Sequence, residues 1–202
     1  MTNPLLSTAL PASDLPRFDA IQPDHVRPAV DALLAQAQTA LDQVTAPEFP
    51  ADFERLSAVL DVATERLGRA WGAVAHLNGV ADTPELRAAY NESLPLITEF
   101  YTRLGADERL YAKYKAVMAS QGEQLSPARR QALSKALRDF VLSGAELTGE
   151  AKARFAVLQE KQAELGQKFS EHVLDATDRY AHFADEAEMD GVPEDVKEAA
   201  RA

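Results

Sequence analysis

The chain has 202 residues, enough for one large domain or two small ones, and its 46% hydrophobic and 26% charged residues are ordinary for a globular protein. Its net charge is −11, with −8 in residues 1–100 and −3 in residues 101–202. Such acidity argues against nucleic acid or an anionic membrane as the main partner, because both attract basic surfaces. The absence of cysteine excludes a disulfide framework and a thiolate metal site.

The start of the chain, MTNPLLSTAL, has no basic region followed by a long apolar core, so it does not resemble a secretory signal. The longest weakly apolar run, Ala70 to Leu77, is too short to span a bilayer. We therefore expect a soluble cytoplasmic protein that has neither a membrane nor a nucleic acid as its partner.

Residues 1–22 carry three prolines and little periodicity, which predicts an extended N-terminal arm. Pro23 then opens a helix that ends before Pro47. Its apolar side chains recur at helical spacing: Val26, Val30, Leu33, Ala37, Leu41 and Val44.

A second helix is predicted over residues 51–78, where apolar residues alternate at steps of three and four. This regular seam is typical of left-handed helix packing. Its members are Phe53, Leu56, Leu60, Ala63, Leu67, Ala70, Val74 and Leu77.

Two further helices have strong start signals, a capping residue followed by proline: Thr83-Pro84 and Ser126-Pro127. The first is expected to end at Gly105 and the second at Gly144, since glycine suits the end of a helix. A shorter helix over residues 107–120 lies between them.

The longest predicted helix runs over residues 148–177, without an internal proline. Its stripe comprises Phe155, Leu158, Gln162, Leu165, Phe169, Val173 and Ala176. A helix of this length cannot bury such a stripe alone, so we expect the preceding helices to pack along it.

The helical pattern fades after Thr177, which allows one short extended segment near residues 178–189, and another helix opens at Glu194. The sequence thus predicts an all-α fold, a bundle of long antiparallel helices. Its parts are the arm (1–22), a helical lobe (23–177), and a final segment (178–202) that enters a shortened last helix.

Little in the sequence indicates chemistry. The four histidines, His25, His76, His172 and His182, lie outside any His-Glu-x-x-His motif, and none follows a glutamate by three residues. The pair of His182 and Glu186 supplies two ligands, too few for a metal site. His172 with Asp175 could orient a base, but no nucleophile is nearby. We therefore expect no catalytic, cofactor-binding or metal-binding residue in this chain.

Several stretches together resemble the N-terminal part of the thimet-oligopeptidase-like zinc peptidases, and most closely the bacterial oligopeptidase A group. Each is weak alone, but their order and spacing cover the whole chain. They are Asn3 to Leu6, LPRFDAIQPDHVRPAV (15–30), HLNGVADTPELRAAY (76–90), Leu94-Pro95-Leu96, LRDFVLSGAEL (137–147), FSEHVLDAT (169–177) and DGVPED (190–195).

The resemblance implies an all-helical, neurolysin-like lobe that forms one wall of a channel admitting short peptides. In this family the zinc lies in a C-terminal lobe, on His-Glu-x-x-His and a downstream glutamate, and the motif's glutamate activates the zinc-bound water. This chain has no position that matches those ligands. The resemblance therefore implies a truncated, non-catalytic lobe that is inactive alone, with no cofactor of its own. Its partners would be the missing catalytic lobe and, in the full-length enzyme, short peptides.

Two alternatives remain open: a stand-alone helical interaction module, and a hydrolase that uses His172 or His182. The hypothesis of an oligopeptidase lobe also predicts exposed apolar surface near Phe140 to Leu142, where the missing lobe would pack.

Overall fold

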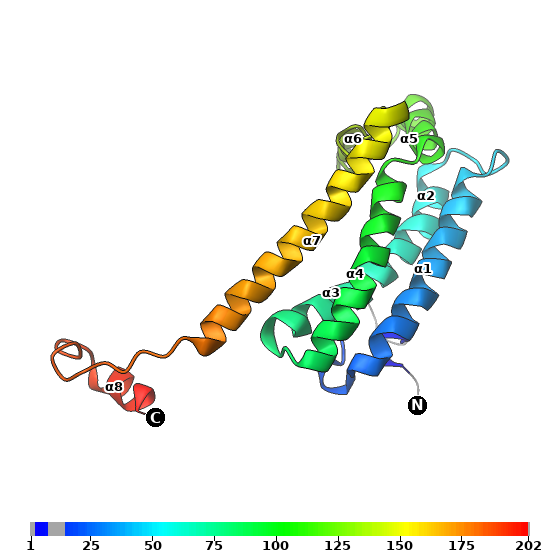
Figure 1. Ribbon diagram of the computed structural model, residues 1–202. Helices are drawn as coiled ribbons and strands as arrows, with labels where there is room; N and C mark the ends of the chain where they lie inside the picture. The colour runs from blue at the N-terminus through cyan, green and yellow to red at the C-terminus, as the bar shows by residue number, and fades with distance from the viewer. Residues whose placement is uncertain (1–2, 8–14, 202) are drawn as a thin grey trace. The chain divides into compact units, whose positions relative to one another are not determined.

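The computed structural model describes residues 3–7 and 15–201, and regular structure in these residues is helical throughout (Figure 1). No strand occurs among them, so the all-α prediction is confirmed. The elements are η1 (Pro4–Leu6), η2 (Phe18–Ala20), α1 (Pro23–Thr45), α2 (Phe53–Leu56), the π-helical η3 (Ser57–Asp61), α3 (Val62–Val80), α4 (Pro84–Gly105), α5 (Glu108–Gln121), α6 (Pro127–Leu142), α7 (Gly149–Arg179) and α8 (Glu194–Ala200).

The chain divides into two compact units, Met1–Gly166 and Gln167–Ala202. Helix α7 begins in the first and ends in the second. Part of the predicted N-terminal arm, residues 1–2 and 8–14, lies outside the described residues. The division into 1–22, 23–177 and 178–202 stays a prediction.

Helix α1 organises the first unit, because its buried side chains belong to two successive cores. In the first core α1 packs beside α3 and α4 (Figure 1). In the second it meets the π turn, α5 and α6. The first core contains Val26, Val30, Leu33, Ala37, Leu67, Ala70, Val74, Leu86, Ile97 and Phe100. The second contains Ala40, Leu41, Val44, Leu56, Leu60, Leu110, Val117, Leu133, Phe140 and Ala145.

Local capping explains where several helices begin. The Thr83 hydroxyl accepts a hydrogen bond from the Leu86 N–H at 3.2 Å, and the Ser126 hydroxyl accepts one from Arg129 at 3.4 Å. Both bonds satisfy N–H groups that the first turn of a helix leaves without a carbonyl partner. The two predicted starts are therefore confirmed.

Gly144 ends α6 as predicted, with a backbone φ of +87°. The N–H of Ala145 reaches back to the carbonyl of Phe140 at 2.9 Å, which closes the helix end in the manner of a Schellman motif. A Cβ atom on Gly144 would come within 3.0 Å of the Leu147 side chain and 3.3 Å of Phe155. Glycine is required here for both its backbone conformation and its small volume.

The predicted uninterrupted helix over residues 51–78 is wrong in one respect. A π turn, Ser57–Asp61, separates α2 from α3, and the helical segment runs from Phe53 to Val80. A π turn inserts an additional residue relative to α-helical spacing, which changes the register of the side chains that follow. Leu56, directly before the π turn, and Leu60, inside it, are both buried.

The stripe predicted on the longest helix is exposed in the first unit, where the expectation of burial is wrong. Leu158 and Leu165 are 55% and 54% exposed, and Phe155 is the stripe residue that lies against the Gly144 turn. Beyond α7, residues 180–185 lack regular structure and residues 186–191 form turns. The extended segment expected near 178–189 is therefore not a strand.

The apolar surface expected near Phe140 to Leu142 is present in part. Val141 and Leu142 are exposed, whereas Phe140 is buried in the second core, where its ring contacts those of Tyr111 and Tyr114. The three consecutive apolar residues thus divide between the interior and the surface.

Candidate functional site

A cavity of ≈ 510 Å³ in the first unit lies where α1, the turn between α4 and α5, and the start of α7 meet. This volume is in the range of small-molecule sites. Apolar and charged side chains share its wall. The lining residues are Gln38, Leu41, Thr102, Arg103, Ala106, Asp107, Glu108, Arg109, Gly144, Lys152, Phe155 and Ala156.

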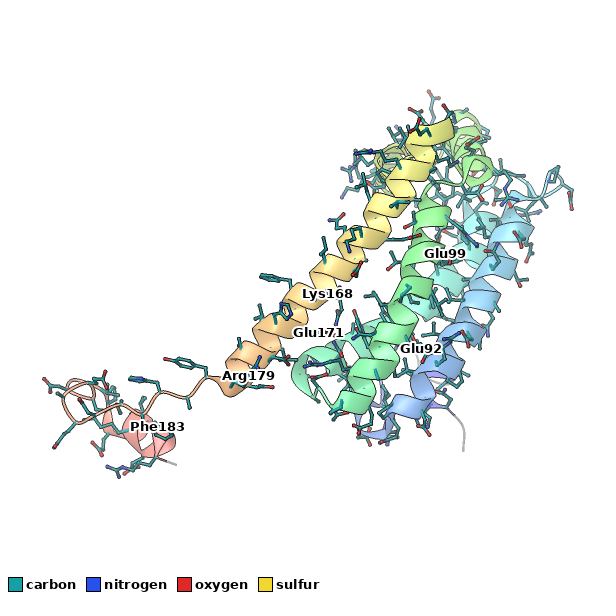
Figure 2. All side chains as sticks on the ribbon, viewed as in Figure 1. Glu92, Glu99, Lys168, Glu171, Arg179 and Phe183 are labelled. Atoms are coloured by element: carbon teal, nitrogen blue, oxygen red, sulfur yellow. The ribbon has the colours of Figure 1, made fainter. Side chains whose placement is uncertain are left out.

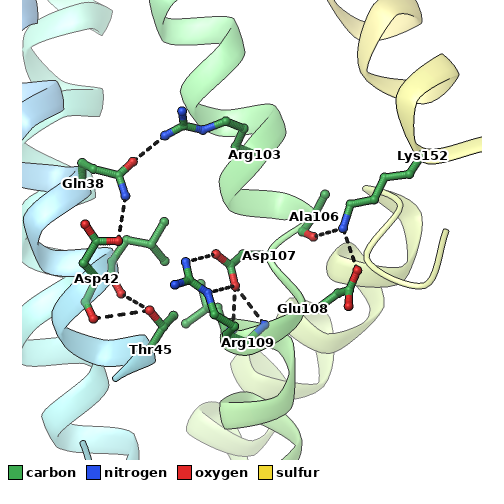
Figure 3. Close-up of polar contacts among 11 residues, drawn as sticks. Gln38, Asp42, Thr45, Arg103, Ala106, Asp107, Glu108, Arg109 and Lys152 are labelled. Atoms are coloured by element: carbon green, nitrogen blue, oxygen red, sulfur yellow. Dashed lines mark hydrogen bonds and ion pairs between the residues drawn. The ribbon is translucent and has the colours of Figure 1, made fainter. Parts of the chain in front are cut away.

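Asp107 is the best-fixed carboxylate at this cavity (Figure 3). It caps α5 by accepting the N–H groups of Arg109 and Leu110 at 2.9 and 3.1 Å. The Arg109 guanidinium also donates to it, at 2.7 Å through one nitrogen and 3.2 Å through another. Burial opposes ionisation of Asp107, but these hydrogen bonds outweigh it and lower its pKa. The hydrogen bond from Asp107 in turn raises the pKa of Arg109.

Lys152 joins the start of α7 to the turn between α4 and α5. Its Nζ atom donates to the Ala106 carbonyl at 3.1 Å and to Glu108 Oε1 at 2.8 Å (Figure 3). The carbonyl lies at the end of α4, where a cation is favourable because carbonyl groups point outward there. Lys152 therefore fixes one wall of the cavity in place.

The opposite wall is a chain of side-chain hydrogen bonds along α1. Arg103 donates to the Gln38 carbonyl oxygen, and Gln38 donates through Nε2 to Asp42 at 3.0 Å (Figure 3). Arg103 also pairs with Glu99 on its own helix at 3.5 Å. This chain orients Arg103 at the cavity.

This arrangement offers charged side chains that could orient a ligand. Three cations and two carboxylates line the cavity, so its wall carries a small positive charge in a chain of net charge −11. Each of these five groups already has a hydrogen-bonding or ionic partner, and the lining contains no serine, cysteine or histidine to serve as nucleophile or base.

A smaller cavity of ≈ 150 Å³ adjoins the π turn and is lined mainly by apolar side chains from α2, α5 and α6. The Ser57 hydroxyl donates to the Asp61 carboxylate across the turn. Burial, with a smaller contribution from the Asp61 charge, raises the pKa of Tyr114 to about 12. Tyr114 therefore stays protonated at neutral pH, which makes it a hydrogen-bond donor rather than a base.

The four histidines lie in four different surroundings. His25 accepts a hydrogen bond from the Gln22 N–H at 3.1 Å, which forms part of the cap of α1. His76 lies 5.3 Å from the Phe18 ring, measured between ring centroids. His172 is exposed, and His182 pairs with Glu188 at 3.4 Å, not with the Glu186 considered and set aside above. Within residues 3–7 and 15–201, no three potential ligands of the His, Cys, Asp or Glu type are grouped to hold a metal ion.

Asn78, near the end of α3, is buried, and its side-chain carbonyl oxygen has no partner among the described residues. The end of α3 is instead closed by the backbone, since Ala81 N–H donates to the Leu77 carbonyl at 2.8 Å. The cavity residues Gln38, Asp107 and Lys152 were not predicted from the sequence. A capping aspartate at position 107 was the one local signal that could have identified any of them.

The sequence between residues 30 and 152 matches the family model of the neurolysin/thimet oligopeptidase N-terminal domain. This match covers more than half of the chain and includes most of the cavity wall. The chain belongs to this family.

The similarity of this chain to individual relatives covers its full length or nearly so. The chain is 41% identical to oligopeptidase A of Salmonella typhimurium and 39% identical to that of Escherichia coli, in both cases over 100% of this chain and 29% of the relative. It is 36% identical to a probable cytosolic oligopeptidase A of Arabidopsis thaliana, over 95% of this chain and 27% of that protein. The chain therefore spans less than a third of the length of these curated relatives. In the part of the chain that the structure describes, no helix is sufficiently long and apolar to traverse a bilayer.

Proposed function

We propose that the chain is the N-terminal, non-catalytic helical lobe of a zinc-dependent oligopeptidase, and that it forms one wall of the channel that admits short peptides. The observation that carries this proposal is the 41% identity to an oligopeptidase A along the whole chain but over only 29% of that relative. In this proposal residues 23–177 supply the lobe, and the protein works in the cytoplasm.

The zinc does not fit this chain. Its described residues hold no group of three suitable ligands, and the polar cavity is lined by groups that already bind one another. In this proposal zinc-assisted hydrolysis takes place in a further part of a longer polypeptide, and no reaction step is assigned to the residues present. The role left for this lobe is to shape and border the space that peptides enter.

Peptide hydrolysis tests the catalytic half of this proposal. The purified 202-residue chain is compared with the product of the longer reading frame, each with added zinc and with a chelator. We expect chelator-sensitive cleavage of short peptides by the longer protein and none by the chain alone. Robust, chelator-sensitive cleavage by the 202-residue chain, or its absence from the longer protein, would contradict the proposal.

Cysteine protection tests the role of channel wall. The chain has no cysteine, so single cysteines can be introduced at exposed positions of α1, α4 and α6 in a longer protein cleared of its other thiols. A non-hydrolysable peptide should slow alkylation on one face of the lobe and leave the other face unaffected. If the peptide changed the alkylation rate at none of these positions, the proposed role as a channel wall would be refuted.

A further inference from the structure

The described residues of the second unit, 167–201, form no core. No side chain is buried in its described residues 167–201, either in the last part of α7 or in α8. An isolated helix as short as α8 is marginal in water, and the part of α7 in this unit has no apolar face covered within the unit. The ordering of this unit therefore requires contacts that it does not make within itself.

Its exposed apolar side chains follow one another along the chain. Phe169 and Val173, 70% and 50% exposed, lie one helical turn apart on α7, and Ala176 and Tyr180 continue the same spacing. The N–H of Tyr180 still bonds to the Thr177 carbonyl at 3.2 Å, which keeps Tyr180 close to helical register. Phe183, the most exposed at 87%, follows in the segment between α7 and α8 (Figure 2).

The same unit is strongly acidic. Residues 167–202 contain ten acidic and four basic side chains, a net charge of −6 out of −11 for the whole chain. Part of the basic charge is already used within the unit, since Lys197 and Arg201 both pair with Glu194, at 3.9 and 3.4 Å. A surface that covers this unit must therefore be apolar at its centre and basic at its border.

We propose that the second unit is a docking arm whose partner is the remainder of the same longer polypeptide, which presents an apolar surface bordered by lysine and arginine. This inference rests on the proposed function. The relatives match this chain over its full length and are more than three times as long, so each contains further polypeptide beyond the matched part. A second copy of the chain fits less well, because two arms of charge −6 repel each other.

Hydrogen exchange of the backbone amides of residues 167–201 tests the docking arm. We compare the 202-residue chain with the longer protein, and the longer protein with its Phe169→Asp/Phe183→Asp variant. We expect exchange at least about tenfold slower in the longer protein, and a return to the rate of the short chain in the variant. The matched control is Ser170→Asp/Ala184→Asp, which adds the same charge at two exposed positions, the first about 100° around α7 from Phe169, and should keep the protection.

Two internal references make the result decisive. Amides of the first core, such as those of Val30 and Val74, report whether the variant still folds. Raising the ionic strength from about 0.05 M to about 0.5 M should speed exchange of the arm in the longer protein, because it screens the basic border.

Three results would overturn the docking arm: equal exchange in the short and long proteins, loss of protection in the control, or protection of the short chain that rises with its own concentration. If ionic strength did not change the exchange rate of the arm, the proposed basic border of its partner surface would be refuted. Peptide hydrolysis by the unsubstituted longer protein is measured in parallel. A protected arm without hydrolysis would refute the proposed function alone, and hydrolysis with an unprotected arm would refute the docking arm alone.

Discussion

The two units of this chain differ in how many side chains their amphipathic helices bury. Both contain amphipathic helices, but the helices of the first unit bury ten side chains in each of two cores, whereas the described residues of the second bury none. Helical periodicity is therefore not sufficient for a stable unit, because stability comes from the area removed from water by a neighbouring element. The comparison leads to pairs of substitutions that are alike in chemistry and differ only in the unit they occupy.

Truncation of a large apolar side chain should show the largest contrast. Leu67 is fully buried in the first core. Replacing it by alanine should leave a cavity and lower the free energy of unfolding of the 202-residue chain by about 2–5 kcal/mol. Phe169→Ala, in the second unit, should change it by less than about 0.5 kcal/mol. Urea denaturation followed by circular dichroism measures both, and equal effects would abolish the distinction between the units.

The second-largest effect on stability is expected when a methyl group is added to a glycine with a left-handed backbone conformation. Gly144 and Gly191 have backbone φ angles of +87° and +76°, but only at Gly144 would the new Cβ meet neighbours. We expect Gly144→Ala to lower the free energy of unfolding by about 1–3 kcal/mol, from backbone strain and crowding together. Gly191→Ala carries the strain alone, in a unit without a core, and should leave the unfolding midpoint unchanged. A midpoint shift for Gly191→Ala as large as that for Gly144→Ala would show that the second unit unfolds with the first.

Removal of a capping carboxylate should have a smaller, pH-dependent effect. Asp107→Ala should cost about 1 kcal/mol near neutral pH, since it removes the cap of α5 and the partner of Arg109. The pKa of Asp107 is lowered in the folded chain, so its stabilisation is complete above the pKa of the unfolded chain, near 4, and is lost as pH falls through the folded value. Urea titrations between neutral and strongly acidic pH should therefore show the wild type and the variant converging.

The matched control for this substitution is Asp185→Ala in the second unit, where the carboxylate accepts the N–H groups of Ala187 and Glu188, both at 2.9 Å. It should leave the free energy of unfolding unchanged at every pH. A difference between wild type and Asp107→Ala that stays constant down to the lowest pH would contradict the assigned role of the Asp107 charge.

Loss of a partly exposed lysine should have the smallest effect. Lys152→Ala removes a hydrogen bond to Ala106 and an ion pair with Glu108, both partly exposed to solvent, so we expect a loss of about 0.5 kcal/mol. Lys197→Ala removes a 3.9 Å contact with Glu194 in the second unit and should cost nothing measurable. A double-mutant cycle of Lys152 with Glu108 measures the pair directly, and a coupling energy of zero would leave only the contact with the carbonyl.

Most of the fold could be predicted from the sequence because its signals are local. The Thr83-Pro84 and Ser126-Pro127 starts and the Gly144 end depend on hydrogen bonds within one helical turn. The seam of α1 and α3 could be read from spacing, since apolar side chains on one face must be buried together. The family could also be recognised, because short stretches in a fixed order identify it without the His-Glu-x-x-His motif.

What the tertiary structure alone decided depends on contacts between distant residues. The π turn at Ser57–Asp61 leaves no mark in a regular apolar pattern, because register is set by the helices that pack on it. The polar cavity combines Gln38, Asp107 and Lys152 from separate elements, so no spacing in the sequence could place them together. The exposure of Leu158 and Leu165 could not be foreseen either. Periodicity fixes which face of a helix is apolar, whereas the elements that pack on that face determine whether it is buried.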